Sequence, residues 1–187
     1  GKLLKPETLR IAWTPTVTKG GVAQVGTAAY GMGWCLEELN GHRVVQHAGS
    51  TGTAVFLLPD DGVTVIVLTN LEQLAGGDAL GIARIVAQAY VPGLRYADLQ
   101  PKADPAPDVG ARLRSELANM ARGQIDKSLY TETFAAALEP TLPRQQAGFA
   151  PLGAIEDVLF LGDRSIGEGR VATYRVRFAG VTLYALV

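Results

Sequence analysis

The fold is decided by residues 30–70, which read YGMGWCLEELNGHRVVQHAGSTGTAVFLLPDDGVTVIVLTN. Asn-Gly at 40–41 and Asp-Asp-Gly at 60–62 both supply the positive φ that tight reversals need. Between these signals the pattern favours antiparallel strands at 33–39, 42–47, 53–58 and 63–69, which together make a β-meander. The last strand is a nearly continuous apolar run, which is typical of a strand covered on both faces.

The residues on either side of the meander predict helices. Pro6 favours a short helix over residues 6–13. Asp78 can cap a second helix that ends before Pro92. Its apolar side chains recur at helical spacing and predict that it covers the sheet through Leu80, Ile82, Ile85, Val86 and Ala89.

A proline-rich stretch follows and predicts a domain boundary. Residues 96–108 contain Pro101, Pro105 and Pro107 without apolar periodicity, which favours an extended linker. We therefore expect one domain over residues 1–95 and a second, smaller domain over 109–187.

The second domain is predicted to be helical first and then antiparallel. Helices are expected at 109–121 and, capped by Ser128, through 138. Strands are expected at 152–161, 170–178 and 181–186. Arg175 and Arg177 alternate with apolar residues, which indicates a strand with one wet face and not an anion site. The whole chain is thus expected to be α+β.

Composition and charge exclude several classes of protein. Hydrophobic residues make up 48% of the 187 residues and charged residues 19%, so the chain can bury a core and is not disordered. The 17 basic residues balance 18 acidic ones, and this balance disfavours a nucleic-acid partner. The apolar run at 63–68 is far below the ~20 residues that cross a bilayer, so we expect no membrane partner.

Few residues are candidates for chemistry. Cys35 is the only cysteine, so it forms no intrachain disulfide, and His42 and His47 fall on opposite faces of one strand. We therefore expect no metal and no cofactor. The adjacent acids at 37–38 and 60–61 are interpreted as solvated charges and a turn.

His47 is more informative, because it ends a strand and is followed by Ala48, Gly49 and Ser50. Gly49 would let a ligand approach the backbone closely. A local nucleophile made of Ser50 and His47 is an alternative, but no acidic residue nearby in the sequence orients the imidazole.

The wider window resembles the C-terminal part of serine β-lactamases and penicillin-binding-protein-like enzymes, closest to the class C, esterase and D-aminopeptidase branch. The resemblance is carried by YGMGW at 30–34, HAGSTG at 47–52, PDDG at 59–62 and VLTN at 67–70. It covers about residues 1–95 and implies a partial β-lactamase-like fold. The second domain is similar to cystatin-like cones appended to some of these proteins.

The resemblance implies roles for four residues. His47 matches the Lys or His that binds a substrate carboxylate or tunes proton transfer. Gly49 would lie against the substrate, and the backbone N–H of Ser50 would donate to the oxyanion. Ala48 stands where the Lys-Thr-Gly version has a hydroxyl, which favours an ester or peptide substrate over a β-lactam. Tyr30 and Trp34 are interpreted as packing residues.

The sequence also departs from the family pattern. No serine is followed by Lys three residues on, and no tyrosine by Asn two residues on. Because acyl transfer needs an activated hydroxyl, we expect this chain to be inactive alone and to be the C-terminal fragment of a serine hydrolase. The parent would take a small-molecule acyl substrate, and the resemblance implies a periplasmic or secreted location.

Two further hypotheses remain open. The chain is alternatively a non-catalytic protein that binds a ligand or partner through its C-terminal cone-like domain. The strand at 63–69 is central in the family, so its far edge should be open here. An open apolar edge predicts a homo-oligomer formed through that strand.

Overall fold

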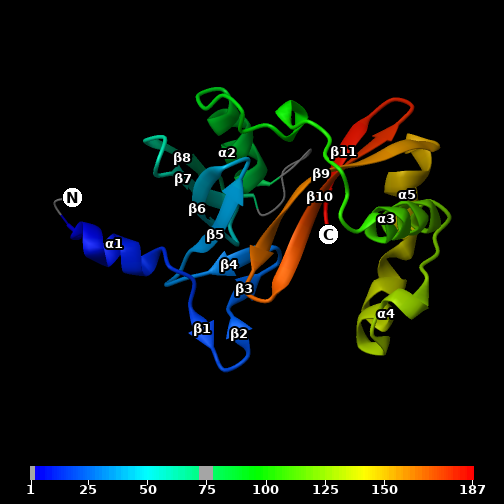
Figure 1. Ribbon diagram of the computed structural model, residues 1–187, viewed down its shortest axis with the longest axis horizontal. Coiled ribbons are helices and arrows are strands. Elements are labelled where there is room, and N and C mark those ends of the chain that lie inside the picture. The colour runs from blue at the N-terminus through cyan, green and yellow to red at the C-terminus, as the bar shows by residue number, and fades with distance from the viewer. Residues whose placement is uncertain (1–2, 72–77) are drawn as a thin grey trace. The chain divides into compact units, whose positions relative to one another are not determined.

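The computed structural model describes residues 3–71 and 78–187. It confirms the α+β class, with helices beside antiparallel sheets (Figure 1). The chain divides into two compact units. The first contains Gly1–Leu99 with Arg164–Val171, and the second contains Gln100–Asp163 with Ala172–Val187.

The first unit is built on a six-stranded antiparallel sheet with the order β3-β4-β5-β6-β7-β8. Helix α1 (Pro6–Ala12) and the two-stranded pair β1 (Val17–Thr18) and β2 (Gly21–Val22) precede it. The strands of the large sheet are β3 (Gln24–Val25), β4 (Ala28–Tyr30), β5 (Cys35–Leu39), β6 (His42–Gly49), β7 (Thr53–Leu58) and β8 (Val63–Leu68). The meander and the short first helix are therefore confirmed.

The two turns that the sequence predicted have the expected geometry. Asn40 has φ 55° and Gly41 has φ 86° between β5 and β6, and Gly62 has φ 68° between β7 and β8. These left-handed residues reverse the chain in little space, which fixes the register of the neighbouring strands. Leu39 consequently pairs with His42, and Leu58 with Val63.

Helix α2 (Ala79–Gln88) covers one face of the sheet, as expected, and lies against β7 and β8 (Figure 1). Asp78 caps it by accepting from the backbone N–H of Gly81 at 2.6 Å. The predicted contact face is wrong in part, however. The helix buries Ala79, Ala83 and Ala87, whereas Ile82, Ile85 and Val86 are exposed.

The interpretation of β8 as covered on both faces is also wrong. Val63, Val65 and Val67 pack against the core beneath α2, but Ile66 and Leu68 are 58% and 77% exposed. The residues of this apolar run are mostly β-branched, which suits them to a strand. Only one face of β8 packs against a core.

The opposite face of the sheet receives residues from far along the chain. Leu36 and Val45 pack with Ile166, and Trp34 contributes to the same cluster. The guanidinium of Arg164 donates to the carbonyl of Thr27 at 2.6 Å. Residues 164–171 thus group with the first unit, although the sequence analysis placed them in the second domain.

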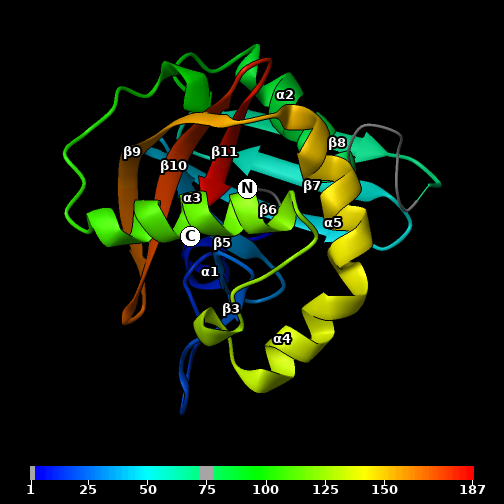
Figure 2. The same ribbon diagram turned by 90° about the vertical axis from the view of Figure 1, so that its right-hand side faces the viewer.

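The second unit contains α3 (Pro107–Met120), α4 (Glu132–Leu138), α5 (Leu142–Phe149) and most of a three-stranded antiparallel sheet with the order β11-β10-β9, of which residues 164–166 and 169–171 group with the first unit. Its strands are β9 (Ile155–Ile166), β10 (Gly169–Phe178) and β11 (Thr182–Leu186). Helix α3 lies across the sheet in Figure 2, and Val109 and Leu113 pack against Phe160 and Tyr174.

Two helix predictions in this unit need correction. Ser128 lies in a 3-10 turn (Lys127–Leu129), and α4 is capped instead by Thr131, whose hydroxyl accepts from the Phe134 N–H at 3.3 Å. Helix α5 was not predicted from the sequence. The alternation in β10 is confirmed, because Tyr174, Val176 and Phe178 are buried and Arg177 is exposed.

Candidate functional site

His47 lies near the end of β6, opposite Val55 of β7. Its side chain is exposed, whereas the neighbouring Gln46 is only 6% exposed. Because side chains alternate along a strand, His47 shares the face of Val45, and Gln46 faces α2 with Val44. The strand therefore presents the imidazole at the surface.

Tyr30 contacts this imidazole. Its hydroxyl lies 3.2 Å from Nε2 of His47, and the rings meet edge to face with centroids 6.2 Å apart. Tyr30 is half-buried and belongs to β4, which is separated from β6 by β5. Sequence reasoning treated Tyr30 as a packing residue, although the YGMGW motif that contains it was noted.

Ala48, Gly49 and Ser50 continue from His47 into the hairpin loop between β6 and β7. Gly49 pairs with Thr53, so the loop contains three residues. The N–H of Gly52 donates to the Gly49 carbonyl at 3.0 Å, and Gly52 has φ 81°. This is a tight three-residue hairpin with a left-handed last position. It places Ser50 at the surface, directly after the strand.

The loop is held in place by residues at the end of β8. The hydroxyl of Thr69 donates to the Gly52 carbonyl at 2.5 Å. A Cβ added to Gly52 would overlap the carbonyl oxygen of Leu71, and one added to Gly49 would overlap Oγ1 of Thr53. Sequence reasoning quoted Gly52 and Thr69 within motifs but assigned neither a role, because their contact joins loops 17 residues apart.

His42 belongs to a different environment. Its Nδ1 lies 3.0 Å from both carboxylate oxygens of Asp61, and Arg43 pairs with Asp60 at 2.8 Å. The acids at 60–61 thus pair with β6 in addition to forming a turn. Within residues 3–71 and 78–187, no three His, Cys, Asp or Glu side chains gather around a metal position.

Glu37 was interpreted as solvated, and this is wrong. Its side chain is 9% exposed, accepts from Nε2 of Gln46 at 3.1 Å and pairs with Arg84 of α2 at 3.5 Å. Burial, with a smaller effect from the Glu37 charge, raises the pKa of the Cys35 thiol. Burial likewise raises the pKa of Tyr96. The contacts among Glu37, Gln46 and Arg84 join α2 to the sheet on the face away from His47.

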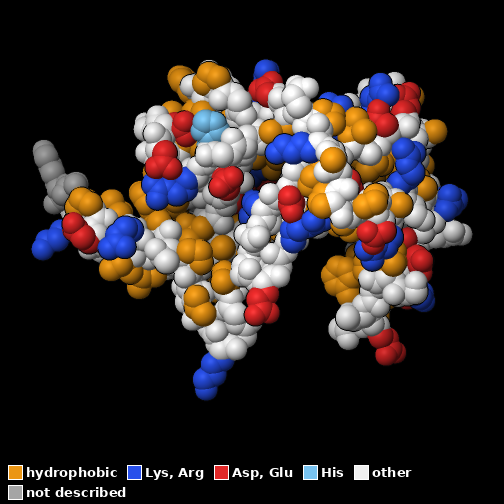
Figure 3. Space-filling view, viewed as in Figure 1, with side chains coloured by type: hydrophobic (Ala, Val, Ile, Leu, Met, Phe, Trp, Pro, Cys, Tyr) orange, Lys and Arg blue, Asp and Glu red, His pale blue; other side chains and the backbone are white. Residues whose placement is uncertain are grey.

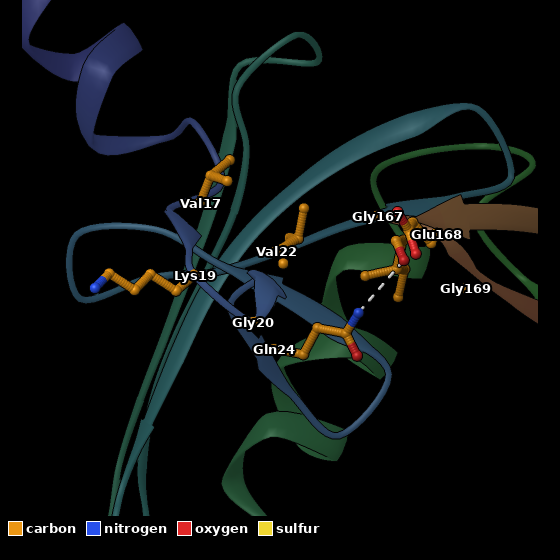
Figure 4. A pocket seen from close by; sticks show the side chains of 10 residues that line it. Val17, Lys19, Gly20, Val22, Gln24, Gly167, Glu168 and Gly169 are labelled. Atoms are coloured by element: carbon orange, nitrogen blue, oxygen red, sulfur yellow. Dashed lines mark hydrogen bonds between the residues drawn. The ribbon is translucent and has the colours of Figure 1, made fainter.

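A hollow of about 540 Å³ lies beside β1 and β2 in the first unit. The side-chain amide of Gln24, which is labelled in Figure 4, donates from Nε2 to the carbonyl oxygen of Ile166 at 3.4 Å. Lys19 extends away from Glu168 in the same view. The charged residues of the lining, Lys19 and Glu168, therefore do not converge on one point.

A buried carboxylate in the second unit was missed by sequence reasoning. Glu116 is 7% exposed and accepts from Asn119 at 2.8 Å, from the Tyr130 hydroxyl at 3.0 Å and from the Asp126 N–H. Burial, the hydrogen bond to Glu116 and the charges of Glu116 and Asp126 raise the pKa of Tyr130 to about 12. The donors satisfy the carboxylate, which indicates a structural role.

The surface view shows basic and acidic side chains interspersed on the face drawn in Figure 3. No helix in the described part of the chain has the length and apolar character that crossing a membrane requires.

Comparison with known proteins gives one finding. A family model described as Beta-lactamase matches residues 1–90, slightly less than half of the chain. The match supports a β-lactamase-like serine hydrolase relationship for this part of the sequence and does not extend to the second unit. No match was found among curated proteins or among solved structures.

Proposed function

We propose that residues 1–95 are the substrate-binding edge and closing helix of a β-lactamase-like serine hydrolase of the class C, esterase and D-aminopeptidase branch. Residues 109–187 are an appended domain that follows the linker at 96–108. The parent enzyme hydrolyses an ester, amide or β-lactam through a serine outside this chain. The main support for this proposal is structural: His47 is exposed at the end of β6, and the hairpin loop that follows is held in place by Thr69. Both belong to the part of the sequence that matches the family model.

His47 supplies the group that binds the substrate carboxylate. When Tyr30 donates its hydroxyl proton to Nε2, the proton of the neutral imidazole resides on Nδ1, and that N–H can donate to a ligand. When the imidazole is protonated, both nitrogens are donors and the ring attracts an anion. Tyr30 orients the ring in the first case without occupying Nδ1.

Gly49 and Ser50 supply the backbone surface beside the substrate. Gly49 lies beside the substrate, although Oγ1 of Thr53 fills the place that a Cβ of Gly49 would take. The backbone N–H of Ser50 acts as one oxyanion donor. The second donor would be the N–H of the nucleophile itself. Because Ala48 has no hydroxyl, an ester or peptide is favoured over a β-lactam.

The chain by itself is proposed to be inactive. Its serines, at positions 50, 115, 128 and 165, all lack a lysine three residues later. Ser50 does not replace the missing nucleophile, because the Nε2 atom of His47 is engaged by Tyr30 and, within the described residues, no hydrogen bond joins Ser50 to His47. Without an activated hydroxyl, bound substrate is not acylated.

The binding half of this proposal is tested by titrating the ¹⁵N-labelled chain with benzylpenicillin, which offers both a carboxylate and carbonyl groups. We expect amide shifts concentrated at residues 47–50 at millimolar ligand. His47→Ala should abolish them, whereas His42→Gln, which changes the other histidine, should retain them. Shifts absent from residues 47–50, or unchanged in His47→Ala, would contradict the proposal.

A second candidate function is ligand binding by the second unit. A pocket of about 410 Å³ lies between α3 and β9 and is lined largely by apolar atoms, including those of Leu117, Ile155 and Phe178. An apolar small molecule fits this lining. Binding of a fluorescent apolar probe that Leu117→Trp abolishes would support it, and binding that is unaffected would exclude this pocket.

A further inference from the structure

The pocket of about 410 Å³ between α3 and β9 has an apolar wall on the helix side. Leu117 and Ala121 are four residues apart and Ala118 and Ala121 are three apart, so these side chains share one side of α3. Phe178, at the end of β10, also lines the pocket and is only 4% exposed. Because the two alanine side chains are short, the wall leaves space for an apolar body.

Two arginines line the same pocket, one before and one after this wall in the sequence. Arg114 is half-buried, and it donates from Nη1 to the Ile155 carbonyl at 2.7 Å and from Nη2 to the Glu156 carbonyl at 3.3 Å. Arg122 is exposed, and its Nη2 donates to Oδ1 of Asn119 at 2.5 Å. A guanidinium has five N–H donors, so these bonds hold each group beside the pocket and leave donors for a ligand.

The charge of these two guanidiniums is not balanced at the pocket. Within the described residues neither of them pairs with a carboxylate, whereas other arginines do, among them Arg43 and Arg84. The described lining includes no acidic side chain. Glu156 and Asp157 lie next to it in β9, but their carboxylates bind Arg177. The pocket therefore combines an apolar wall with an excess of positive charge.

We propose that this pocket binds a small amphipathic carboxylate, such as a short fatty acid. Its hydrocarbon part packs against Leu117, Ile155 and Phe178. Its carboxylate pairs with Arg122, whose planar guanidinium can donate to both oxygens, and the charge of Arg114 adds to the attraction. The inference rests on the ligand-binding role proposed above for the second unit, and it specifies the chemical class of the ligand.

Titration of the full ¹⁵N-labelled chain with octanoate, octanol and octylammonium tests the proposal, because the three probes share one alkyl chain and differ in charge. We expect amide shifts at residues 117–121 and 153–155. Octanoate should bind about tenfold more tightly than octanol, and octylammonium more weakly than octanol. Added salt should weaken the binding of octanoate and leave that of octanol unchanged.

A matched pair of variants identifies the group that binds the carboxylate. Arg122→Met should reduce the affinity for octanoate to that for octanol. Its side chain is exposed, so the fold should persist, as checked by circular dichroism. Arg112→Met removes the same charge about 200° around the helix from Arg114, and should bind octanoate like the unmodified chain.

The outcomes separate this inference from the ligand-binding role on which it rests. Equal affinities for octanoate and octanol, or octanoate binding that Arg122→Met does not weaken, would overturn the carboxylate proposal and leave an apolar-ligand pocket. Failure of both probes to shift residues 117–121 and 153–155 would overturn the ligand-binding role as well.

Discussion

The hydroxyl of Tyr30 lies 3.2 Å from Nε2 of His47, although an entire strand separates β4 from β6 in the sheet. The imidazole is exposed, so this contact is what restricts its orientation at the strand end. A fixed ring presents Nδ1 in a defined direction. An exposed histidine without such a partner would sample several rotamers.

Tyr30→Phe removes the hydroxyl and retains the ring contact. We expect the ring signals of His47 to shift in NMR spectra and its side chain to become more mobile. The free energy of unfolding should fall by less than about 1 kcal/mol, because a hydrogen bond at the surface contributes little net stability. Tyr90→Phe, at a tyrosine that is 72% exposed, is the control and should leave the His47 signals unchanged.

Gly52→Ala tests how tightly the loop after His47 is held. Gly52 and Gly62 both have positive φ, but only Gly52 has a neighbour, the Leu71 carbonyl, where the added methyl would lie. Gly62→Ala should cost about 1–2 kcal/mol for the left-handed backbone alone. We expect Gly52→Ala to cost at least about 1 kcal/mol more by urea denaturation, because the loop must also move. Equal losses would show that the contact to Leu71 is unimportant.

Arg84→Met tests the polar group beneath α2. The substitution removes Arg84 from the Glu37 carboxylate, which is 9% exposed, and leaves the hydrogen bond from Gln46 in place. We expect a loss of about 1–3 kcal/mol in the free energy of unfolding, because removing one donor leaves a buried carboxylate only partly satisfied. Arg112→Met breaks the exposed pair with Asp108 and should cost less than about 1 kcal/mol. A similar loss in both variants would exclude a special role for the Glu37 pair.

The raised pKa of Tyr130 gives a prediction for alkaline pH. Its pKa is about 12 in the folded state, against 10.0 for the free side chain. The folded state therefore holds this proton more tightly, and the resulting stability is fully present below about pH 10 and is lost as the pH rises through about 12.

Phenolate absorbance measured during an alkaline titration checks this prediction. A tyrosine step near pH 12 in the folded chain should be missing in Tyr130→Phe. In Glu116→Gln the same step should move toward pH 10, because the negative charge and the hydrogen bond to it both contribute to the shift. A Tyr130 step already near pH 10 in the unmodified chain would contradict the described contact.

The β-meander could be predicted from the sequence because its determinants are local. Asn40 and Gly41 adopt the left-handed backbone that their types favour, and Asp78 caps α2 as its position suggested. The face of α2 could not be predicted in the same way. Small Ala83 lets the helix approach the sheet closely, and this geometric advantage outweighed the greater hydrophobicity of Ile85.

The parts of the site that escaped prediction depend on contacts between distant residues. Position 47 was identified from a motif, but the contact with Tyr30 depends on where β5 begins. Its first residue, Cys35, pairs with Tyr30 on one side and with Gln46, the neighbour of His47, on the other. Thr69 binds the Gly52 carbonyl across a hairpin. Ile166 returns to the first unit from a strand that, by sequence, belongs to the second domain. Such non-local packing leaves no periodic signal in the sequence.

We propose that this chain carries the substrate-binding part of a serine hydrolase and lacks its nucleophile. Intact-mass spectrometry after incubation with a fluorophosphonate probe, and separately with benzylpenicillin, tests for a nucleophile in the chain. We predict no covalent adduct with either reagent, even where benzylpenicillin binds reversibly at His47. A stoichiometric adduct that maps to Ser50, and that His47→Ala abolishes, would instead establish a nucleophile within this chain.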